Sequence, residues 1–149
     1  TEYGLMAINY LAAVHPGKLV NVGEIHRATA VPRELLAKIL SELVRMGLAD
    51  SCSGPNGGFR LSRPLEKISL AEVIAALEKR PALVDCAADP ERCRLKDGCT
   101  IRGSLDDVNR RVSRVLEETP LSELFIYRRN RAGERSEADM ESKRLTDLK

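Results

Sequence analysis

The chain of 149 residues contains four cysteines, and three of them lie close together as Cys86, Cys93 and Cys99. Their spacings leave six and then five intervening residues, which is wider than the usual zinc-ribbon spacing of about two to four. Three is an odd number for a disulfide framework, and we expect no secretory signal. Thiolates grouped in this way suit a soft metal or an iron–sulfur cluster. Cys52 is remote in sequence and is expected to be a small buried residue rather than a ligand.

A cluster of this type takes four protein ligands, whereas the cysteine-rich stretch supplies three. Four cations flank these cysteines and can stabilise thiolates, namely Arg92, Arg94, Lys96 and Arg102. The chain has only two histidines, His15 and His26, and we interpret them as surface or turn residues rather than ligands. The fourth ligand is therefore expected from elsewhere, for example from a partner subunit.

Three helices are predicted ahead of the cysteines. The first covers residues 2–14, where apolar residues recur at helical spacing. Asn21 and Glu24 have the spacing of a capping box, which predicts a second helix from there to about residue 28. Pro32 fits the first position of a third helix, because its missing N–H costs nothing there.

Gly47 is a natural end for the third helix, and residues 48–61 then read as two short strands around a tip of Gly, Pro and Asn. Asn56 and Gly57 favour the positive φ of a tight hairpin turn. Three helices followed by a hairpin is the order of a winged helix-turn-helix. The fold class is therefore predicted to be mainly α with a small β-hairpin, in which a winged helix-turn-helix domain precedes a long dimerisation helix.

The third helix is the predicted reader of double-stranded DNA, because the second helix of such a motif enters the major groove by its N-terminal residues. Arg33 can reach a guanine or a phosphate, the wing can approach the minor groove, and Arg60 and Arg63 can steer phosphates. The predicted contact residues are Pro32, Arg33, Ala37, Lys38, Ser53, Asn56, Gly57 and Arg60. The alternative is a set of ordinary solvated charges, and residues 1–64, with seven Lys/Arg and five Asp/Glu, are too weakly basic to decide.

The rest of the chain has one capping box, one irregular stretch and one long helix. Ser69 and Glu72 predict the start of a helix that reaches about residue 79. Ser104 is expected to cap a longer helix to about residue 118, and a short helix should follow at 121–127. The apolar residues of the longer helix form a narrow stripe of Leu105, Val108, Val112 and Val115. This stripe favours a seam between two subunits, with packing on its own domain as the alternative.

The chain is thus divided into five parts. A DNA-binding domain covers 1–64, a connecting helix 65–80, a cluster-binding loop 81–103 and dimerisation helices 104–127. The charged tail 128–149 has few large apolar groups and is expected to be disordered.

The sequence resembles the IscR/NsrR family of winged-helix regulators that sense iron–sulfur clusters. The resemblance covers about residues 1–127. It rests on Thr1-Glu2-Tyr3-Gly4-Leu5, Ser51-x-x-Gly54-Pro55-x-Gly57-Gly58-Phe59-x-Leu61, Ile68-x-Leu70-x-x-Val73-Ile74 and the three spaced cysteines. It implies a cytoplasmic homodimer whose long C-terminal helices cross, with the cluster loop of one subunit near the DNA-binding domain of the other. It also implies that the cluster changes operator affinity.

In the nitric-oxide-sensing branch of that family, the residue before the tyrosine of the first helix is an acidic ligand, and this position corresponds to Glu2. A carboxylate is a hard ligand for iron and would leave one iron labile. Three cysteines and a carboxylate favour a 4Fe–4S cluster, with 2Fe–2S as the alternative. Otherwise Glu2 is an acid at a helix N-terminus, where the macrodipole favours it.

Three positions depart from the family pattern. Arg102 stands where the iron–sulfur assembly regulator has a histidine, which argues against a histidine-ligated 2Fe–2S cluster. Ser53 stands where the wing often has an arginine, so insertion into the minor groove is weaker or moved. The first cysteine spacing is one residue longer than usual. Residues 99–103 resemble most the branch that regulates the SUF cluster-assembly operon.

The sequence therefore predicts a cluster-sensing transcriptional regulator, in the first place a repressor, of iron–sulfur assembly or iron homeostasis genes. A nitric-oxide- or redox-responsive repressor of the same family is the alternative, and a zinc- or thiol-switch regulator without a cluster is the third possibility. No Gly-rich phosphate loop or Ser/His/Asp arrangement supports an enzyme, and no small-molecule substrate is expected. No segment is long and apolar enough for a membrane span, so no membrane partner is expected.

Overall fold

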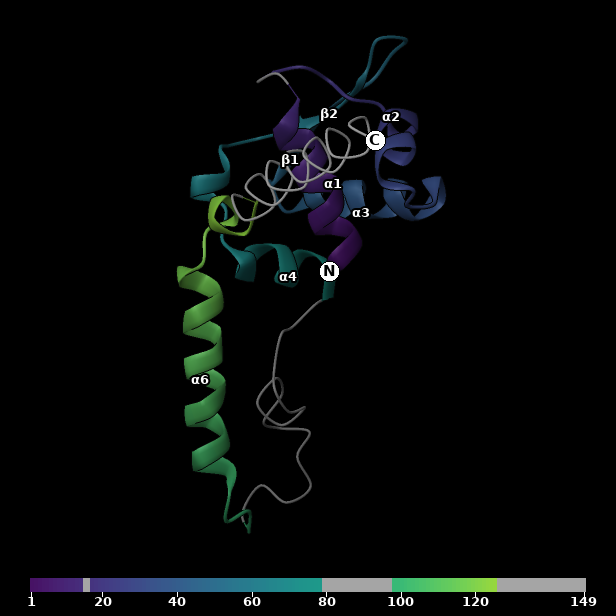
Figure 1. Ribbon diagram of the computed structural model, residues 1–149. Coiled ribbons are helices and arrows are strands. Elements are labelled where there is room, and N and C mark those ends of the chain that lie inside the picture. Colours follow the sequence, from purple (N-terminus) through teal and green to yellow (C-terminus); the bar gives the residue numbers. More distant parts are fainter. Residues whose placement is uncertain (15–16, 79–97, 126–149) are drawn as a thin grey trace, which may run out of the picture.

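Figure 1 shows the computed structural model, which describes residues 1–14, 17–78 and 98–125. The elements are α1 (Glu2–Ala13), α2 (Val22–Thr29), α3 (Arg33–Arg45), β1 (Ala49–Cys52), β2 (Gly58–Leu61), the 3-10 turn η1 (Leu65–Lys67), α4 (Leu70–Glu78) and α6 (Arg102–Glu118). Residues 121–125 are also helical. Mainly helical structure with one two-stranded hairpin confirms the predicted fold class. The predicted tail 128–149 lies outside the described residues.

The helices α1, α2 and α3 pack on one another around an aliphatic core. The buried side chains of α3 recur every three or four residues, as an amphipathic helix requires, and are Leu36, Ile39, Leu40 and Leu43. Val20 exchanges two backbone hydrogen bonds of 2.9 and 2.8 Å with Phe59. The hairpin is thereby attached to the segment that precedes α2.

The turn between α2 and α3 is built by local hydrogen bonds. The predicted capping box is confirmed, because Asn21 Oδ1 accepts from the backbone of Glu24 at 3.0 Å and Glu24 Oε2 accepts from the backbone of Asn21 at 2.9 Å. His26 Nδ1 lies 2.8 Å from the carbonyl oxygen of Val31, so this histidine serves the turn, as expected. Ala30 ends α2 with a left-handed φ of 59°. Pro32 is the N-cap of α3 rather than its first helical residue, because its ψ of 138° is extended.

The wing differs from its prediction in the turn. The hydrogen bond that closes the turn runs from Gly57 N to Gly54 O at 2.9 Å, and the residue with positive φ is Gly54, at 116°, rather than Asn56 or Gly57. Glycine adopts this positive φ readily because it has no Cβ. Gly57 is required for space instead, since a Cβ there would overlap the carbonyl oxygen of Cys52.

Cys52 is exposed, so the prediction of a buried residue was wrong. In β1 only Ala49 is buried, and the three residues after it are exposed. The hairpin projects beyond the helices, at the top of Figure 1, and its outer half has no second layer to cover it.

The second capping box is also confirmed, because Ser69 N donates to Glu72 Oε2 at 2.8 Å and Glu72 N donates to Ser69 Oγ at 3.3 Å. α4 packs on α3 and α1. Its start is linked to the chain after α6 by hydrogen bonds from Leu70 N to Thr119 O, at 2.9 Å, and from Leu121 N to Ile68 O, at 2.8 Å.

α6 extends away from the remainder of the described chain (Figure 1). It begins at Arg102 with Ile101 as N-cap, so the expectation that Ser104 caps it was wrong. The first turn closes earlier because Leu105 N donates to Ile101 O at 3.0 Å. Among the helices that the structure describes, none combines the length and the hydropathy needed to cross a bilayer.

Candidate nucleic-acid interface and cluster-binding residues

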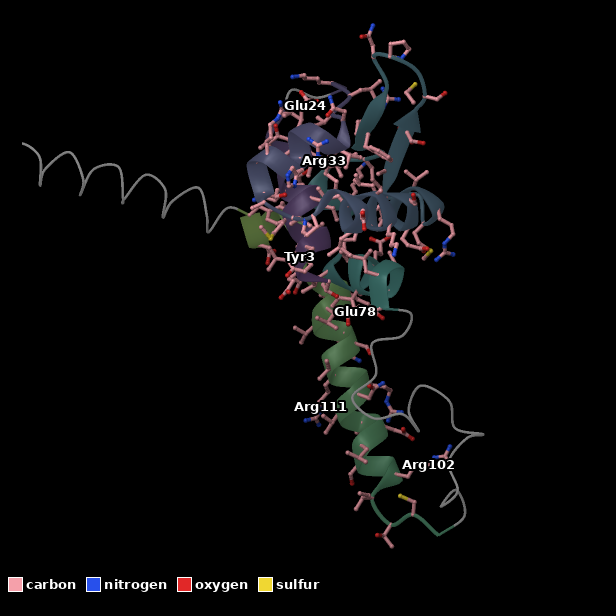
Figure 2. All side chains as sticks on the ribbon, turned by 90° about the vertical axis from the view of Figure 1, so that its right-hand side faces the viewer. Tyr3, Glu24, Arg33, Glu78, Arg102 and Arg111 are labelled. Carbon is pink, nitrogen blue, oxygen red and sulfur yellow. The ribbon has the colours of Figure 1, made fainter. Side chains whose placement is uncertain are left out.

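The predicted reading residues lie on the outer face of α3. Pro32, Arg33, Ala37 and Lys38 are all exposed, because the apolar stripe of the helix faces the core. The guanidinium of Arg33 lies over the start of α2, since a Cβ built on Gly23 would be 3.7 Å from its Nη2 atom. Figure 2 labels Arg33 on the outer surface of the helical domain. Within the described ranges, neither Arg33 nor Lys38 forms an ion pair. Both charges are therefore available to a polyanion.

The wing presents polar groups at its tip and a cation at its base. Ser53 and Asn56 are exposed, and Gly57 is half-buried. The segment 53–57 has no charged side chain, so the tip can approach DNA only through polar and backbone groups. Arg60 is exposed on β2, and its Nε lies 3.2 Å from Oδ2 of Asp50. Sequence reasoning missed this partner. A signal was available, because residues at equal distances from the centre of a hairpin face each other, and Asp50 and Arg60 both lie five positions from Pro55.

Arg63, which the sequence predicts to steer phosphates, forms an ion pair within the domain. Its Nη2 lies 2.6 Å from Oε1 of Glu72, the residue that also caps α4. Its Nε is buried and has no partner within the described residues. The ion pair thereby connects the segment after β2 to the first turn of α4. The cysteine-containing segment follows α4 in the sequence.

Glu72 is expected to make stability depend on pH in acid. Partial burial by itself raises the pKa of Glu72, but hydrogen bonds from Ser69 and Arg63 and the guanidinium charge outweigh it and hold the pKa below the ordinary 4.5. The carboxylate therefore stabilises the fold above pH 4.5, and this contribution is lost as the pH falls through the lowered folded value. We expect the difference in free energy of unfolding between wild type and Glu72→Gln to shrink from about pH 6 to about pH 3 in urea titrations. A constant difference would contradict the assignment.

The cysteine site is described only in part. Cys86 and Cys93, and with them the loop 81–97, lie outside the described residues. Cys99 is half-buried and stands three residues before α6. Glu2 is exposed at the start of α1. In the part of the chain that the structure describes, no three metal-binding side chains come together.

Within one chain, Glu2 and Cys99 are not brought together. α6 has 17 residues and is therefore about 25 Å long. Its C-terminal end is joined to α4 by the Leu70–Thr119 hydrogen bond, so Cys99 stands at the distant end of this helix. Figure 1 shows the start of α1 close to α4 and the start of α6 at the opposite end of the molecule. One chain of this structure therefore does not form a site that contains both residues.

The comparison with protein families decides what kind of protein this is. A family model described as Rrf2, iron-dependent transcriptional regulator, matches residues 1–126. The chain belongs to the Rrf2 family. It is therefore a transcriptional regulator and not an enzyme.

Solved structures of other Rrf2 regulators are similar to this chain. CymR (YrzC), the global cysteine regulator of B. subtilis, is 25% identical with a TM-score of 0.68, over 85% of this chain and 92% of that one. IscR of T. potens is 21% identical with a TM-score of 0.62, over 83% of this chain and 80% of that one. The oxidized form of Staphylococcus aureus CymR is 22% identical with a TM-score of 0.60, over 83% and 90%. These similarities confirm the family resemblance and the winged-helix fold.

Proposed function

We propose that this Rrf2 regulator is a homodimeric repressor that holds an iron–sulfur cluster and reads an operator with α3 and the wing. The observation that carries the sensing part is the triad Cys86, Cys93 and Cys99 in a family of iron-dependent regulators. Genes of iron–sulfur assembly or iron homeostasis are the proposed targets, and chromosomal targets imply a cytoplasmic protein. Duplex DNA and a second copy are its partners, without a membrane or a small-molecule substrate.

The surface of α6 supports the homodimer. Val108, Val112 and Val115 are 43%, 42% and 63% exposed along one stripe. Leaving such side chains in water is unfavourable, and a second α6 crossing this seam would bury them. A two-fold dimer would also present two copies of α3 to a palindromic operator. The domain division 1–64, 65–80, 81–103 and 104–127 is proposed on the same grounds.

The dimer also offers the fourth ligand. Because α6 holds Cys99 about 25 Å from the α4 junction of its own chain, a carboxylate from the other copy is the better placed donor. We assign this role to Glu2 of the partner subunit. Three thiolates and one carboxylate fit a 4Fe–4S cluster with one weakly held iron, and 2Fe–2S is the alternative.

Glu2→Ala is expected to retain a cluster that decays several-fold faster or slower on exposure to oxygen or nitric oxide, because one iron changes its ligand. The decay is followed by visible absorption after anaerobic purification. Glu66→Ala removes another exposed carboxylate, on η1, and is the matched control. Identical decay in Glu2→Ala and wild type would remove Glu2 from the ligand set.

Arg33→Ala is expected to weaken operator binding by about 1–3 kcal/mol, or roughly fivefold to 150-fold, because a base-reading arginine is lost. The operator is selected from a random duplex library, and affinities are compared at one salt concentration. Arg45→Ala is the control, since Arg45 ends the same helix and is paired with Glu42 at 2.6 Å. An unchanged sequence preference in Arg33→Ala would mean that this end of α3 does not read bases.

The proposed function as a whole is tested by operator binding of anaerobic holo and apo protein, with the cluster type read by spectroscopy. We expect a coloured holo form and different affinities for the two forms. A colourless protein whose affinity is independent of iron would contradict cluster sensing.

A thiol-switch regulator without a cluster is the second candidate, favoured by the 25% identity to the cysteine regulator CymR. It predicts a colourless protein whose operator affinity responds to oxidants and thiols. Nitric-oxide or redox sensing through the cluster is the alternative within the first candidate. Faster cluster loss with nitric oxide than with oxygen would favour it.

A further inference from the structure

The wing carries an ion pair on the face that is turned away from the core. Asp50 stands directly opposite Arg60 in the antiparallel register, so the two side chains share a face of the hairpin. Phe59 and Leu61 alternate with Arg60 and pack on the core from the other face. The side chains of Arg60 and Asp50 are 48% and 50% exposed. A ligand as large as a DNA strand can therefore reach this pair.

A second cation lies near Arg60. A half-open groove of about 520 Å³ runs between the end of α1 and residues 60–66, and the charged residues that line it are Lys18, Arg60, Arg63 and Glu66. Among the described residues, Lys18 forms no ion pair. Arg63 is held by Glu72, so Lys18 and Arg60 are the cations that this groove offers to a phosphate backbone, beside the carboxylate of Glu66. Asp50 neutralises Arg60.

We propose that Asp50 is a positioning residue that limits the affinity of the wing for DNA by competing with phosphate for Arg60. An exposed ion pair of this kind is weak, so a DNA phosphate can displace Asp50 from the guanidinium of Arg60. The negative charge of the Asp50 carboxylate then repels the phosphates of the DNA. Phosphate contacts add affinity without sequence information. Asp50 therefore suppresses non-specific binding and leaves more of the discrimination to α3. This inference rests on the proposed use of the wing in DNA binding.

The test uses the full-length dimer, purified anaerobically, and a short duplex of random sequence over a range of salt concentrations. Asp50→Asn is expected to lower the dissociation constant about fivefold. Arg60→Gln is expected to raise it and to reduce the slope of log affinity against log salt by about 1.8, because the dimer loses one phosphate contact in each of its two wings. In the Arg60→Gln background, Asp50→Asn should bring no gain, because its effect passes through Arg60.

Asp107→Asn is the matched control, since Asp107 is paired with Arg110 on α6 and its loss changes the net charge equally. No change with Asp50→Asn, or an equal gain with Asp107→Asn or in the Arg60→Gln background, would overturn the inference. Asp50→Ser replaces Asp50→Asn if the amide variant unfolds at a lower temperature than wild type. Failure of the wild-type dimer to bind any duplex would instead contradict the proposed function.

Discussion

Cys99→Ala is expected to abolish iron–sulfur cluster binding and to leave the fold intact. One of three thiolates is lost, and a cluster left with two cysteines is not retained through purification. The fold should survive because Cys99 precedes α6 and does not belong to the core, which is built from α1 to α4, the hairpin and Leu121. The measurements are visible absorption and iron and sulfide content per chain after anaerobic purification, with the thermal midpoint as the test of folding.

The cysteines provide their own controls. Cys86→Ala and Cys93→Ala should lose the cluster as Cys99→Ala does. Cys52→Ala should keep it, since Cys52 is exposed in β1 and lies in the wing. A normal cluster in any of the first three variants, or a lost cluster in Cys52→Ala, would contradict the assignment of three ligands and one bystander.

Val112→Glu is expected to dissociate the dimer and to reduce operator affinity by roughly a hundredfold or more, because a monomer reads one half-site. The substitution places a carboxylate in the middle of the apolar stripe of α6, and two-fold symmetry repeats it in both subunits. Burying an unpaired charge costs several kcal/mol, and we expect the apolar contact between the two α6 helices not to offset this cost. The protomer should still fold, since Val112 is 42% exposed within one chain.

Analytical ultracentrifugation and operator titrations check this result. Val112→Leu keeps the position apolar and should remain dimeric with wild-type affinity. Figure 2 shows Arg111, the preceding residue, on the same helix. Arg111→Glu adds a carboxylate next to the stripe, where it stays in water, and should weaken the dimer less. If Val112→Glu forms a dimer as stable as the wild type, the subunits associate through another surface.

Much of the fold could be predicted because its signals are local. The two capping boxes, at Asn21 with Glu24 and at Ser69 with Glu72, act over three residues and are both present in the structure. The apolar period of α3 is also a local property, and it separates the buried stripe from the exposed Arg33 and Lys38.

The wrong predictions, for Cys52, the wing turn and the start of α6, concern residue types that occur in more than one structural environment. A cysteine in a strand suits burial or exposure equally, and only the projection of the hairpin leaves Cys52 in water. Glycines next to Asn56 and Pro55 allow several turns, and the bond from Gly57 to Gly54 selects one. Ser104 is a good cap, but the backbone bond from Leu105 to Ile101 starts α6 earlier.

The sequence by itself determined the order of the helices and the hairpin, the two capping boxes, and the triad of thiols that suits an iron–sulfur cluster, because these depend on neighbouring residues. The tertiary structure alone decided that Arg63 holds Glu72. It also decided that α6 separates Cys99 from Glu2 within one chain. The reason is physical: such pairings depend on how packed elements bring distant segments together or keep them apart, and no local pattern records those distances.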